Sequence, residues 1–299
     1  MDNVPFAFAQ KNHPLAPHTR YRIGGPAAWA LFPPTTSAMK EAYHWLMETN
    51  TPFIVLGGGT NVLIDDQGYP GCVLFTTKLQ TMQPLGNHRY TVGAGMMLSD
   101  VVRQLLLPNN YHGVGALTGI PGTVGGAVYM NAGTANGSIC ELTETVSLLR
   151  GGRFETVSVT PDAYGYRGQS FCKENEVIVD ATLACVRSEH NEADTYHHYM
   201  QRRKTTQPEG WCCGSVFKNP PNDHAGRLIE AVGLKGTRHN GACISDKHAN
   251  FIMNEDTASF DDVLYLITLA KDKVREQFGV ELKEEVRIIP HRTLSAGVE

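Results

Sequence analysis

The chain has 299 residues, 41% of them apolar, which is enough to bury a sizeable core in two domains or in one large lobed domain. Its net charge of -4 excludes nucleic acid or a membrane surface as the main ligand, because both demand concentrated positive charge. Seven cysteines without a CxxC pair predict neither a disulfide framework nor a zinc site, so no metal is expected. Without a signal peptide or a membrane-length apolar run, we expect a cytoplasmic protein.

The first predicted elements lead into a run of glycines. Apolar periodicity predicts a strand over 28–32, a helix over 37–50 with Ser37 as its N-cap, and a strand over 53–56. That strand runs directly into Gly57-Gly58-Gly59-Thr60-Asn61. Successive glycines let backbone N–H groups surround one anionic oxygen, so a diphosphate could bind there. A glycine turn without a ligand is the alternative interpretation.

A second glycine-rich segment covers residues 117–133, after a predicted helix over 100–107 that begins at Ser99. Its notable members are Gly119, Pro121, Gly122, Thr123, Gly125 and Gly126. Glycine inside a regular element costs about 0.5–1 kcal/mol relative to alanine, so this density favours close approach to a ligand over packing. Neither glycine segment has the spacing of a dinucleotide fingerprint or a P-loop.

A strand-rich region follows. Strands are predicted over 145–149 and 154–159 around the hairpin signal Gly151-Gly152, and over 177–183. Between them, Tyr166-Arg167 stands in a loop flanked by glycines. An arginine in such a loop could bind a carboxylate bidentately, although a solvated loop arginine gives the same pattern. A helix over 194–207 carries Arg203 near its C-terminus, where cations are favourable in any protein.

The second half centres on Gly214-Ser215-Val216-Phe217-Lys218-Asn219-Pro220. The glycine permits close approach to a ligand and the proline holds Asn219 in an extended or turn conformation, which indicates that Ser215 is presented from a strand edge or a turn. A hairpin with a surface lysine is the alternative. A helix is predicted over 225–232 after Asp223, and a mixed turn and strand over 244–254 contains His248, a residue type that is more often a core or capping group.

The chain closes with two clear patterns. Ser259 and Asp262 form the capping box of a long helix that ends at Gly279. A strand over 280–289 places Glu285 and Arg287 on one face, which is also the pattern of a surface ion-pair ladder.

Together these motifs resemble the UDP-N-acetylenolpyruvoylglucosamine reductase family, flavoenzymes of peptidoglycan precursor synthesis. The resemblance runs from about Arg22 to Ile289 and includes Asn131-Ala132-Gly133 and the closing Glu285-Val286-Arg287-Ile288-Ile289. The spacing from Arg167 to Ser215 leaves no room for the tyrosine-bearing insertion of one branch, so the chain resembles the branch without it. Trp211-Cys212-Cys213 and His239-Asn240 depart from the family pattern.

The resemblance implies an α+β fold. It consists of a two-lobed FAD-binding module of the vanillyl-alcohol-oxidase (PCMH) type over 1–190, with lobes over about 1–75 and 76–190. A smaller α/β substrate-binding domain covers 200–285, and a tail over 286–299 returns to the first lobe. It also implies noncovalent FAD, NADPH as co-substrate and a nucleotide-sugar substrate. We expect a monomer, without nucleic-acid or membrane partners.

The resemblance further implies roles for individual residues. Hydride reaches the substrate from the flavin, while Arg167 binds the substrate carboxylate, Glu285 stabilises the enol-like intermediate and Ser215 donates a proton to the α carbon. Substrate contacts fall to Tyr166, Lys218 and Asn219. Cofactor contacts fall to Gly57, Gly58, Gly59, Thr60, Asn61, Gly119, Pro121, Gly122, Thr123, Gly125, Gly126, Arg203, His248 and Arg287. Two alternatives stay open: a related flavin oxidase of alcohols, and a non-catalytic nucleotide or flavin binder.

Overall fold

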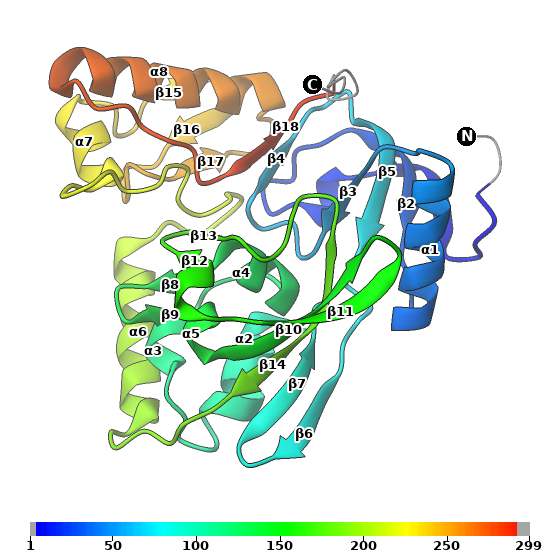
Figure 1. Cartoon of the computed structure of the whole chain (residues 1–299). Helices are drawn as coiled ribbons and strands as arrows, with labels where there is room; N and C mark the ends of the chain where they lie inside the picture. Colours follow the sequence, from blue (N-terminus) through cyan, green and yellow to red (C-terminus); the bar gives the residue numbers. More distant parts are fainter. Residues whose placement is uncertain (1–3, 292–299) are drawn as a thin grey trace. The chain divides into compact units, whose positions relative to one another are not determined.

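The computed structural model describes residues 4–291, in which the chain divides into two compact units (Figure 1). The first unit comprises the chain up to Lys11, Trp29–Gly58 and Gly71–Arg202. The second comprises Asn12–Ala28, Gly59–Pro70 and the chain from Arg203 onward. Each unit is therefore assembled from three separate segments. The domain boundaries implied by the resemblance stay a prediction, and residues 292–299 of the predicted tail lie outside the described part.

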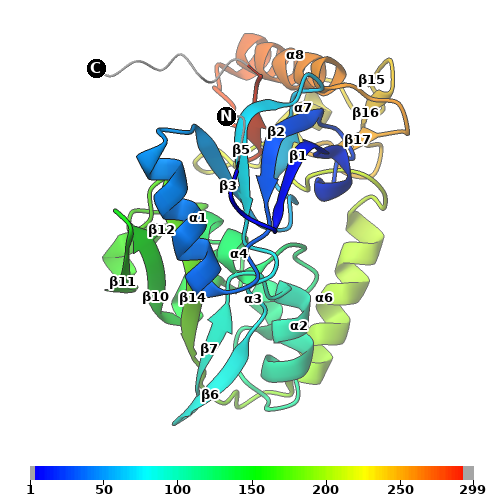
Figure 2. The same ribbon diagram turned by 90° about the vertical axis from the view of Figure 1, so that its right-hand side faces the viewer.

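A four-stranded sheet and one helix form the first lobe. The strand order is β1-β2-β5-β3, with β1 over Ala9–Pro14, β2 over Pro26–Leu31, β3 over Phe53–Leu56 and β5 over Tyr69–Phe75. Helix α1, Thr36–Glu48, is the blue helix of Figure 2. It buries Met39, Ala42, Tyr43 and Leu46, the stripe that its periodicity predicted. The predicted N-cap was wrong, because the hydroxyl of Thr35 accepts the Ala38 N–H, whereas Ser37 lies inside the first turn and donates to Glu41.

A five-stranded antiparallel sheet forms the second lobe of the first unit. Its order is β11-β10-β14-β7-β6, with β6 over Met82–Gly86, β7 over Arg89–Gly93, β10 over Thr143–Arg150, β11 over Arg153–Ser158 and β14 over Val177–Ala184. The predicted hairpin is confirmed: Arg150 pairs with Arg153 across Gly151 and Gly152, whose φ angles are 52° and 75°. Positive φ at both central residues matches the right-handed twist of the strands.

Short helices cover this sheet, and one of them lies inside the second glycine segment. Helix α4, Val124–Met130, was not predicted from the glycine-rich sequence, yet Val124, Ala127 and Val128 bury one helical face. The predicted helix over 100–107 is α2, Leu98–Val101, continued by a π-helical turn over Val102–Leu106, and its N-cap is Met97 rather than Ser99. The remaining short elements are α3 Val114–Leu117, β8 Gly133–Thr134, β9 Gly137–Ser138, α5 Ile139–Leu142, η3 Pro161–Ala163, β12 Tyr164–Gly165 and β13 Gly168–Gln169.

In the second unit, helix α8 lies across a small antiparallel sheet (Figure 1). The sheet contains β15 Arg238–His239, β16 Ala242–Ile244 and β17 Ile252–Asn254, and α7 covers Ala225–Ala231. Helix α8, Phe260–Phe278, has the predicted capping box between Ser259 and Asp262 and ends at Gly279 in the left-handed conformation. Both ends of α8 could be predicted from the sequence, because each depends on residues within one helical turn.

The remaining elements include a closing strand that is shorter than predicted. Strand β18, Arg287–Ile289, pairs in parallel with β4, Val62–Ile64, but residues 280–286 have only an isolated bridge between Glu284 and Phe217. A 3-10 turn covers Ala16–His18, and helix α6 covers Glu192–Thr206. Within residues 4–291, none of the helices has both the length and the apolar composition needed to cross a membrane.

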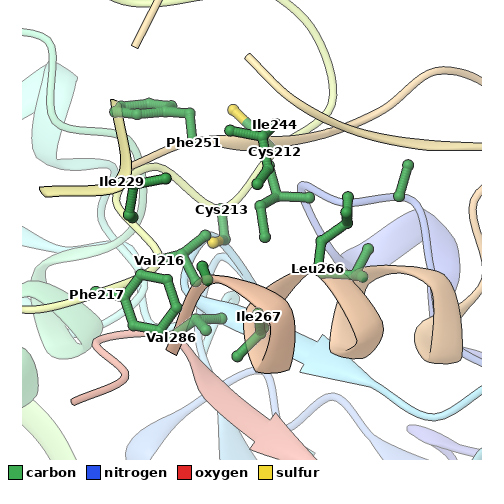
Figure 3. Close-up of a cluster of buried hydrophobic side chains, with 14 of the residues drawn as sticks. Cys212, Cys213, Val216, Phe217, Ile229, Ile244, Phe251, Leu266, Ile267 and Val286 are labelled. Carbon is green, nitrogen blue, oxygen red and sulfur yellow. The ribbon is translucent and has the colours of Figure 1, made fainter. Parts of the chain in front are cut away.

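The two departures from the family pattern have local structural roles. Asn240 has a φ of 45°, which asparagine tolerates better than most residues, and its amide donates to Asp262 Oδ1 at 2.7 Å. The His239 ring stacks on Tyr265 with centroids 3.8 Å apart. Cys212 and Cys213 are buried in the apolar core of the second unit, beside Val216, Ile267 and their neighbours (Figure 3). The residues that depart from the family pattern therefore make packing and hydrogen-bonding contacts within the second unit.

Candidate functional site

Gly57 and Gly58 of the first glycine segment lie against the second glycine segment within the first unit, and packing explains several of these glycines. A Cβ on Gly57 would overlap the Thr123 hydroxyl, and one on Gly58 would stand 3.1 Å from Gly122 Cα. A Cβ on Gly125 would be 2.8 Å from Ala94 Cβ. The inference that this glycine density has no use in packing was therefore wrong. The φ angles of Gly119 and Gly122, 72° and 114°, require glycine for a second reason.

Gly126 and Thr123 are the two residues of this segment that packing leaves unexplained. A Cβ on Gly126 would have the Thr123 hydroxyl as its nearest neighbour, at an ordinary 3.6 Å. The Thr123 hydroxyl is buried and has no hydrogen-bond partner within residues 4–291. A buried hydroxyl without a partner costs about 1–3 kcal/mol, so a polar group from a ligand would stabilise this site. The residues present thus fit a bound phosphate-bearing cofactor.

The Tyr166-Arg167 pair is held against the end of the second glycine segment. Arg167 has a φ of 55°, uncommon for a residue with a side chain, and its Nη2 donates to the Gly133 carbonyl at 2.8 Å. Its guanidinium lies 5.2 Å from the centre of the Tyr166 ring, and 58% of Tyr166 is exposed. The amide of Asn131 donates to the Gly165 carbonyl at 2.8 Å. These two hydrogen bonds therefore join the loop that contains Tyr166-Arg167 to the Asn131-Ala132-Gly133 segment.

The Ser215 and Glu285 segments lie side by side in the second unit. The Val216 carbonyl accepts the Glu285 N–H at 2.7 Å and the Val286 N–H at 3.2 Å. The Lys218 N–H donates to the Lys283 carbonyl at 2.9 Å. Partly buried Ser215 therefore stands one residue from the hydrogen bond that also fixes Glu285. Sequence alone could not pair these segments, because no local signal links them.

Asn61 anchors the Glu285 strand from the other side. Its side-chain Nδ2 donates to the Glu285 carbonyl at 2.9 Å, and the main-chain carbonyl of Asn61 accepts the Arg287 N–H at 3.0 Å. The first glycine segment, through Asn61, thus continues into the pairing of β4 with β18. The structure brings Ser215, Glu285 and Asn61 together in the second unit, whereas Arg167 and Tyr166 belong to the first.

The other predicted site residues occupy defined places. Asn219 Oδ1 accepts the Ala225 N–H at 3.1 Å, so this side chain helps to begin α7. The Arg203 guanidinium donates to Gln207 Oε1 at 2.9 Å near the end of α6. Thr60 lies in the second-unit part of the first glycine segment, and Pro121 lies in the second glycine segment.

His248 is a partly buried histidine with a defined hydrogen bond. Its Nδ1 accepts the Asn250 N–H at 3.2 Å, and its ring meets the edge of Phe251 at a centroid distance of 4.8 Å. Burial lowers the pKa of His248 below 6.5, because the charged imidazolium is poorly solvated there. His248 is therefore neutral near pH 7, with its proton on Nε2.

The cysteines are inert structural groups. All seven are free and buried. Burial raises the pKa of the Cys213 thiol to about 12, and it raises the pKa of the adjacent Tyr21 hydroxyl well above its usual value of 10.0. Both groups stay uncharged beneath the Ser215 segment. In residues 4–291, no group of three or more His, Cys, Asp or Glu side chains could hold a metal ion.

Comparisons with known proteins found two matching family models and several similar proteins. Residues 206–289 match the C-terminal domain of UDP-N-acetylenolpyruvoylglucosamine reductase, and residues 27–150 match an FAD binding domain. The reductase of Syntrophobacter fumaroxidans is 40% identical over 290 residues, covering 93% of this chain and 83% of that protein. The chain belongs to the UDP-N-acetylenolpyruvoylglucosamine reductase family.

Further relatives of this family support the fold. The reductase of Caldicellulosiruptor bescii is 38% identical, covering 93% of this chain and 90% of that protein. The crystal structure of the Thermus caldophilus reductase matches with a TM-score of 0.80 at 33% identity, covering 94% of this chain and 98% of that one. This match confirms the predicted α+β fold class, with an FAD binding domain that precedes the C-terminal domain of the reductase.

Replacing His248 by asparagine should make the protein less sensitive to acid. The unfolded chain binds a proton at this histidine near pH 6.5, whereas the folded protein resists it, so stability is lost as the pH falls through 6.5 toward the lower folded pKa. In His248→Asn the amide oxygen can still accept the Asn250 N–H but cannot be protonated. Tm measured from about pH 8 to about pH 5 should fall less than in the native protein.

The matched control is His198→Asn, which changes an exposed histidine on α6. Its Tm should follow the native pH dependence. An equal loss of Tm in His248→Asn and the native protein would remove His248 from the pH response.

Proposed function

We propose that this protein reduces the enolpyruvyl ether of UDP-N-acetylglucosamine to UDP-N-acetylmuramate in peptidoglycan precursor synthesis. The observation that carries the proposal is the 40% identity to a reductase of this name over 93% of the chain. A span of that length includes both glycine segments, the Tyr166-Arg167 pair and Ser215. The match to the reductase C-terminal domain over residues 206–289 includes Ser215 and Glu285. We also propose that the protein acts in the cytoplasm as a monomer, with NADPH as co-substrate and no nucleic-acid or membrane partner.

The cofactor site is proposed to include both glycine segments. When bound, FAD supplies hydride, received from NADPH, to the β carbon of the enolpyruvyl group. The buried Thr123 hydroxyl and the open face of Gly126 support this placement, since both suit a ligand phosphate. The remaining proposed contacts are Gly57, Gly58, Gly59, Thr60, Asn61, Gly119, Pro121, Gly122, Gly125, Arg203, His248 and Arg287. The FAD binding domain match over residues 27–150 supports the choice of cofactor.

Three side chains then handle the charge and the proton. Hydride addition at the β carbon places negative charge on the α carbon and its carboxylate, which calls for a cation, a hydrogen-bonding group and a proton. Arg167 would bind the carboxylate, Glu285 would help to stabilise the enol-like intermediate, and Ser215 would pass its proton to the α carbon. Positioned proton transfer is worth about 10²- to 10⁴-fold in rate.

The substrate is proposed to contact Tyr166, Lys218 and Asn219. The exposed Tyr166 ring stacks on Arg167, so it can shape the site beside the carboxylate. Lys218 carries positive charge three residues after Ser215, where it suits a diphosphate, and Asn219 stands next to it. These roles are implied by the family resemblance and can be tested by substitution.

Replacing Ser215 by alanine should separate the two half-reactions. The variant should keep its flavin and be bleached by NADPH under anaerobic conditions, because no step of that half-reaction uses the serine proton. Adding the enolpyruvyl nucleotide should then fail to restore the flavin absorbance, with a loss of about 10²-fold or more in the rate of recolouring.

Normal recolouring of Ser215→Ala would exclude Ser215 as the proton donor. The same spectra distinguish the two alternative functions. Flavin oxidation by oxygen with an alcohol substrate, and no response to the nucleotide, would indicate a flavin oxidase. A binding protein would show no turnover of NADPH with the nucleotide, with or without Ser215.

Glu285 and its neighbour Glu284 offer a matched pair of substitutions. Glu285→Gln should lower kcat by about 10²-fold with a modest change in KM, because the Glu285 carboxyl group would act on the enol-like intermediate, which forms only during the reaction. Glu284→Gln should stay near the native rate, since the Glu284 carboxylate is paired with Lys271 at 2.7 Å. Equal rates for both variants would assign Glu285 to a surface ion-pair ladder.

The Gly126→Ala variant tests the cofactor placement. Alanine suits the middle of α4, where glycine costs about 0.5–1 kcal/mol, and its Cβ meets no protein atom closer than 3.6 Å. The apoprotein should therefore keep its Tm or gain slightly, while the ratio of flavin to protein absorbance falls. Gly57→Ala should instead lower the Tm of the apoprotein, because its Cβ overlaps Thr123. Unchanged flavin content in Gly126→Ala would place the cofactor elsewhere.

A further inference from the structure

Asn250 holds the two residues that follow Ser215. Its side chain is 3% exposed, its Oδ1 accepts the Phe217 N–H at 2.9 Å, and its Nδ2 donates to the Phe217 carbonyl at 2.8 Å. Its main-chain carbonyl accepts the Val216 N–H at 2.9 Å. A primary amide of this length satisfies a donor and an acceptor of one backbone residue at once, whereas aspartate lacks the donor and glutamine is one methylene longer.

The same backbone carries the hydrogen bonds to Glu285. The Val216 carbonyl accepts the Glu285 and Val286 N–H groups. Val216 is therefore hydrogen-bonded to Asn250 through its N–H and to Glu285 through its carbonyl. The apolar side chains of Val216, Phe217 and Val286 fill the core beneath, close to Ile267 of α8 (Figure 3). Burial makes these hydrogen bonds hard to exchange for water, and the segment is correspondingly rigid.

The residue directly before Ser215 is a glycine, which makes no side-chain contacts of its own. Gly214 has a φ of 86°, and a Cβ placed on it would meet no protein atom within 4 Å. The space beside Gly214 is therefore open rather than packed. The orientation of the Ser215 hydroxyl depends on its C-terminal side, where Asn250 makes the side-chain contacts.

We propose that Asn250 is a positioning residue for the reduction, which fixes the Ser215 hydroxyl relative to Glu285 and to the carbon that Ser215 protonates. The inference rests on the proposed function, in which Ser215 is the proton donor. A serine hydroxyl is a weak acid, so its transfer depends on alignment, and a displacement of about 1 Å can cost about 10²-fold in rate.

Asn250→Asp tests this role in the flavin-loaded enzyme. The variant keeps an oxygen for the Phe217 N–H but sets a second oxygen against the Phe217 carbonyl. Flavin content and the anaerobic rate of reduction by NADPH should stay native. The rate of recolouring by the enolpyruvyl nucleotide should fall about 10- to 100-fold, with little change in KM and a larger solvent deuterium isotope effect. Asn250→Ser, which is smaller and uncharged, is the second variant should the aspartate prevent folding.

Asn254→Asp is the matched control. Asn254 is 6% exposed in the same unit, and its amide donates to the Tyr21 carbonyl at 2.8 Å and accepts the Ala258 N–H at 3.0 Å. Losing its donor should cost stability in the same way as in Asn250→Asp. Its recolouring rate should remain native, because its hydrogen bonds do not reach Val216 or Phe217.

The double variant Ser215→Ala with Asn250→Asp shows whether Asn250 acts through Ser215. It should recolour no more slowly than Ser215→Ala alone. A further slowing, a native rate in both Asn250 variants, or equal slowing in Asn254→Asp would each overturn the inference. A native rate in Ser215→Ala would instead exclude Ser215 as the proton donor, and a native protein that the nucleotide does not recolour would refute the proposed function, so these failures are distinguishable.

Discussion

The hydrogen bonds of the Val216 carbonyl are the constraint on which the second unit depends. This one oxygen accepts N–H groups from Glu285 and Val286, so it joins the segment after Ser215 to the C-terminal strand. Apolar side chains bury both segments, and the loss of either would leave backbone polar groups unpaired in the core. The spacing of Ser215 and Glu285 is thus set by the fold itself, which is a precondition for chemistry that uses both.

Glycine serves two purposes in the first unit. Gly57, Gly58 and Gly125 pack so closely against neighbouring residues that a Cβ would have too little space. Gly119 and Gly122 instead adopt positive φ angles, which residues with side chains rarely adopt. Only after these are explained does Gly126 stand out, beside the partnerless hydroxyl of Thr123. The distinction matters because a glycine required for packing and one required for a ligand respond differently to alanine.

The side chains that hold the site are amides rather than charged groups, with Asn250 buried and Asn61 partly buried. Asn61 and Asn250 each bind a donor or acceptor of the main chain beside a proposed catalytic residue, without adding charge to the core. An ion pair there would carry a desolvation penalty of several kcal/mol, whereas an amide supplies a donor and an acceptor at little electrostatic cost. The neutral His248, Cys213 and Tyr21 belong to the same pattern.

Local signals determined what the sequence could reveal. The capping box of Ser259 and Asp262, the stop at Gly279 and the Gly151-Gly152 hairpin depend on residues a few positions apart, and the ordered motifs identified the family. The tertiary structure alone decided that Thr35 rather than Ser37 caps α1, that α4 begins within the glycine segment and that the closing strand shrinks to Arg287–Ile289. It alone assigned Asn61 and Asn250, whose partners are 224 and 33 residues away. Periodicity and caps are written in neighbouring residues, but hydrogen bonds between distant segments exist only once the chain has folded.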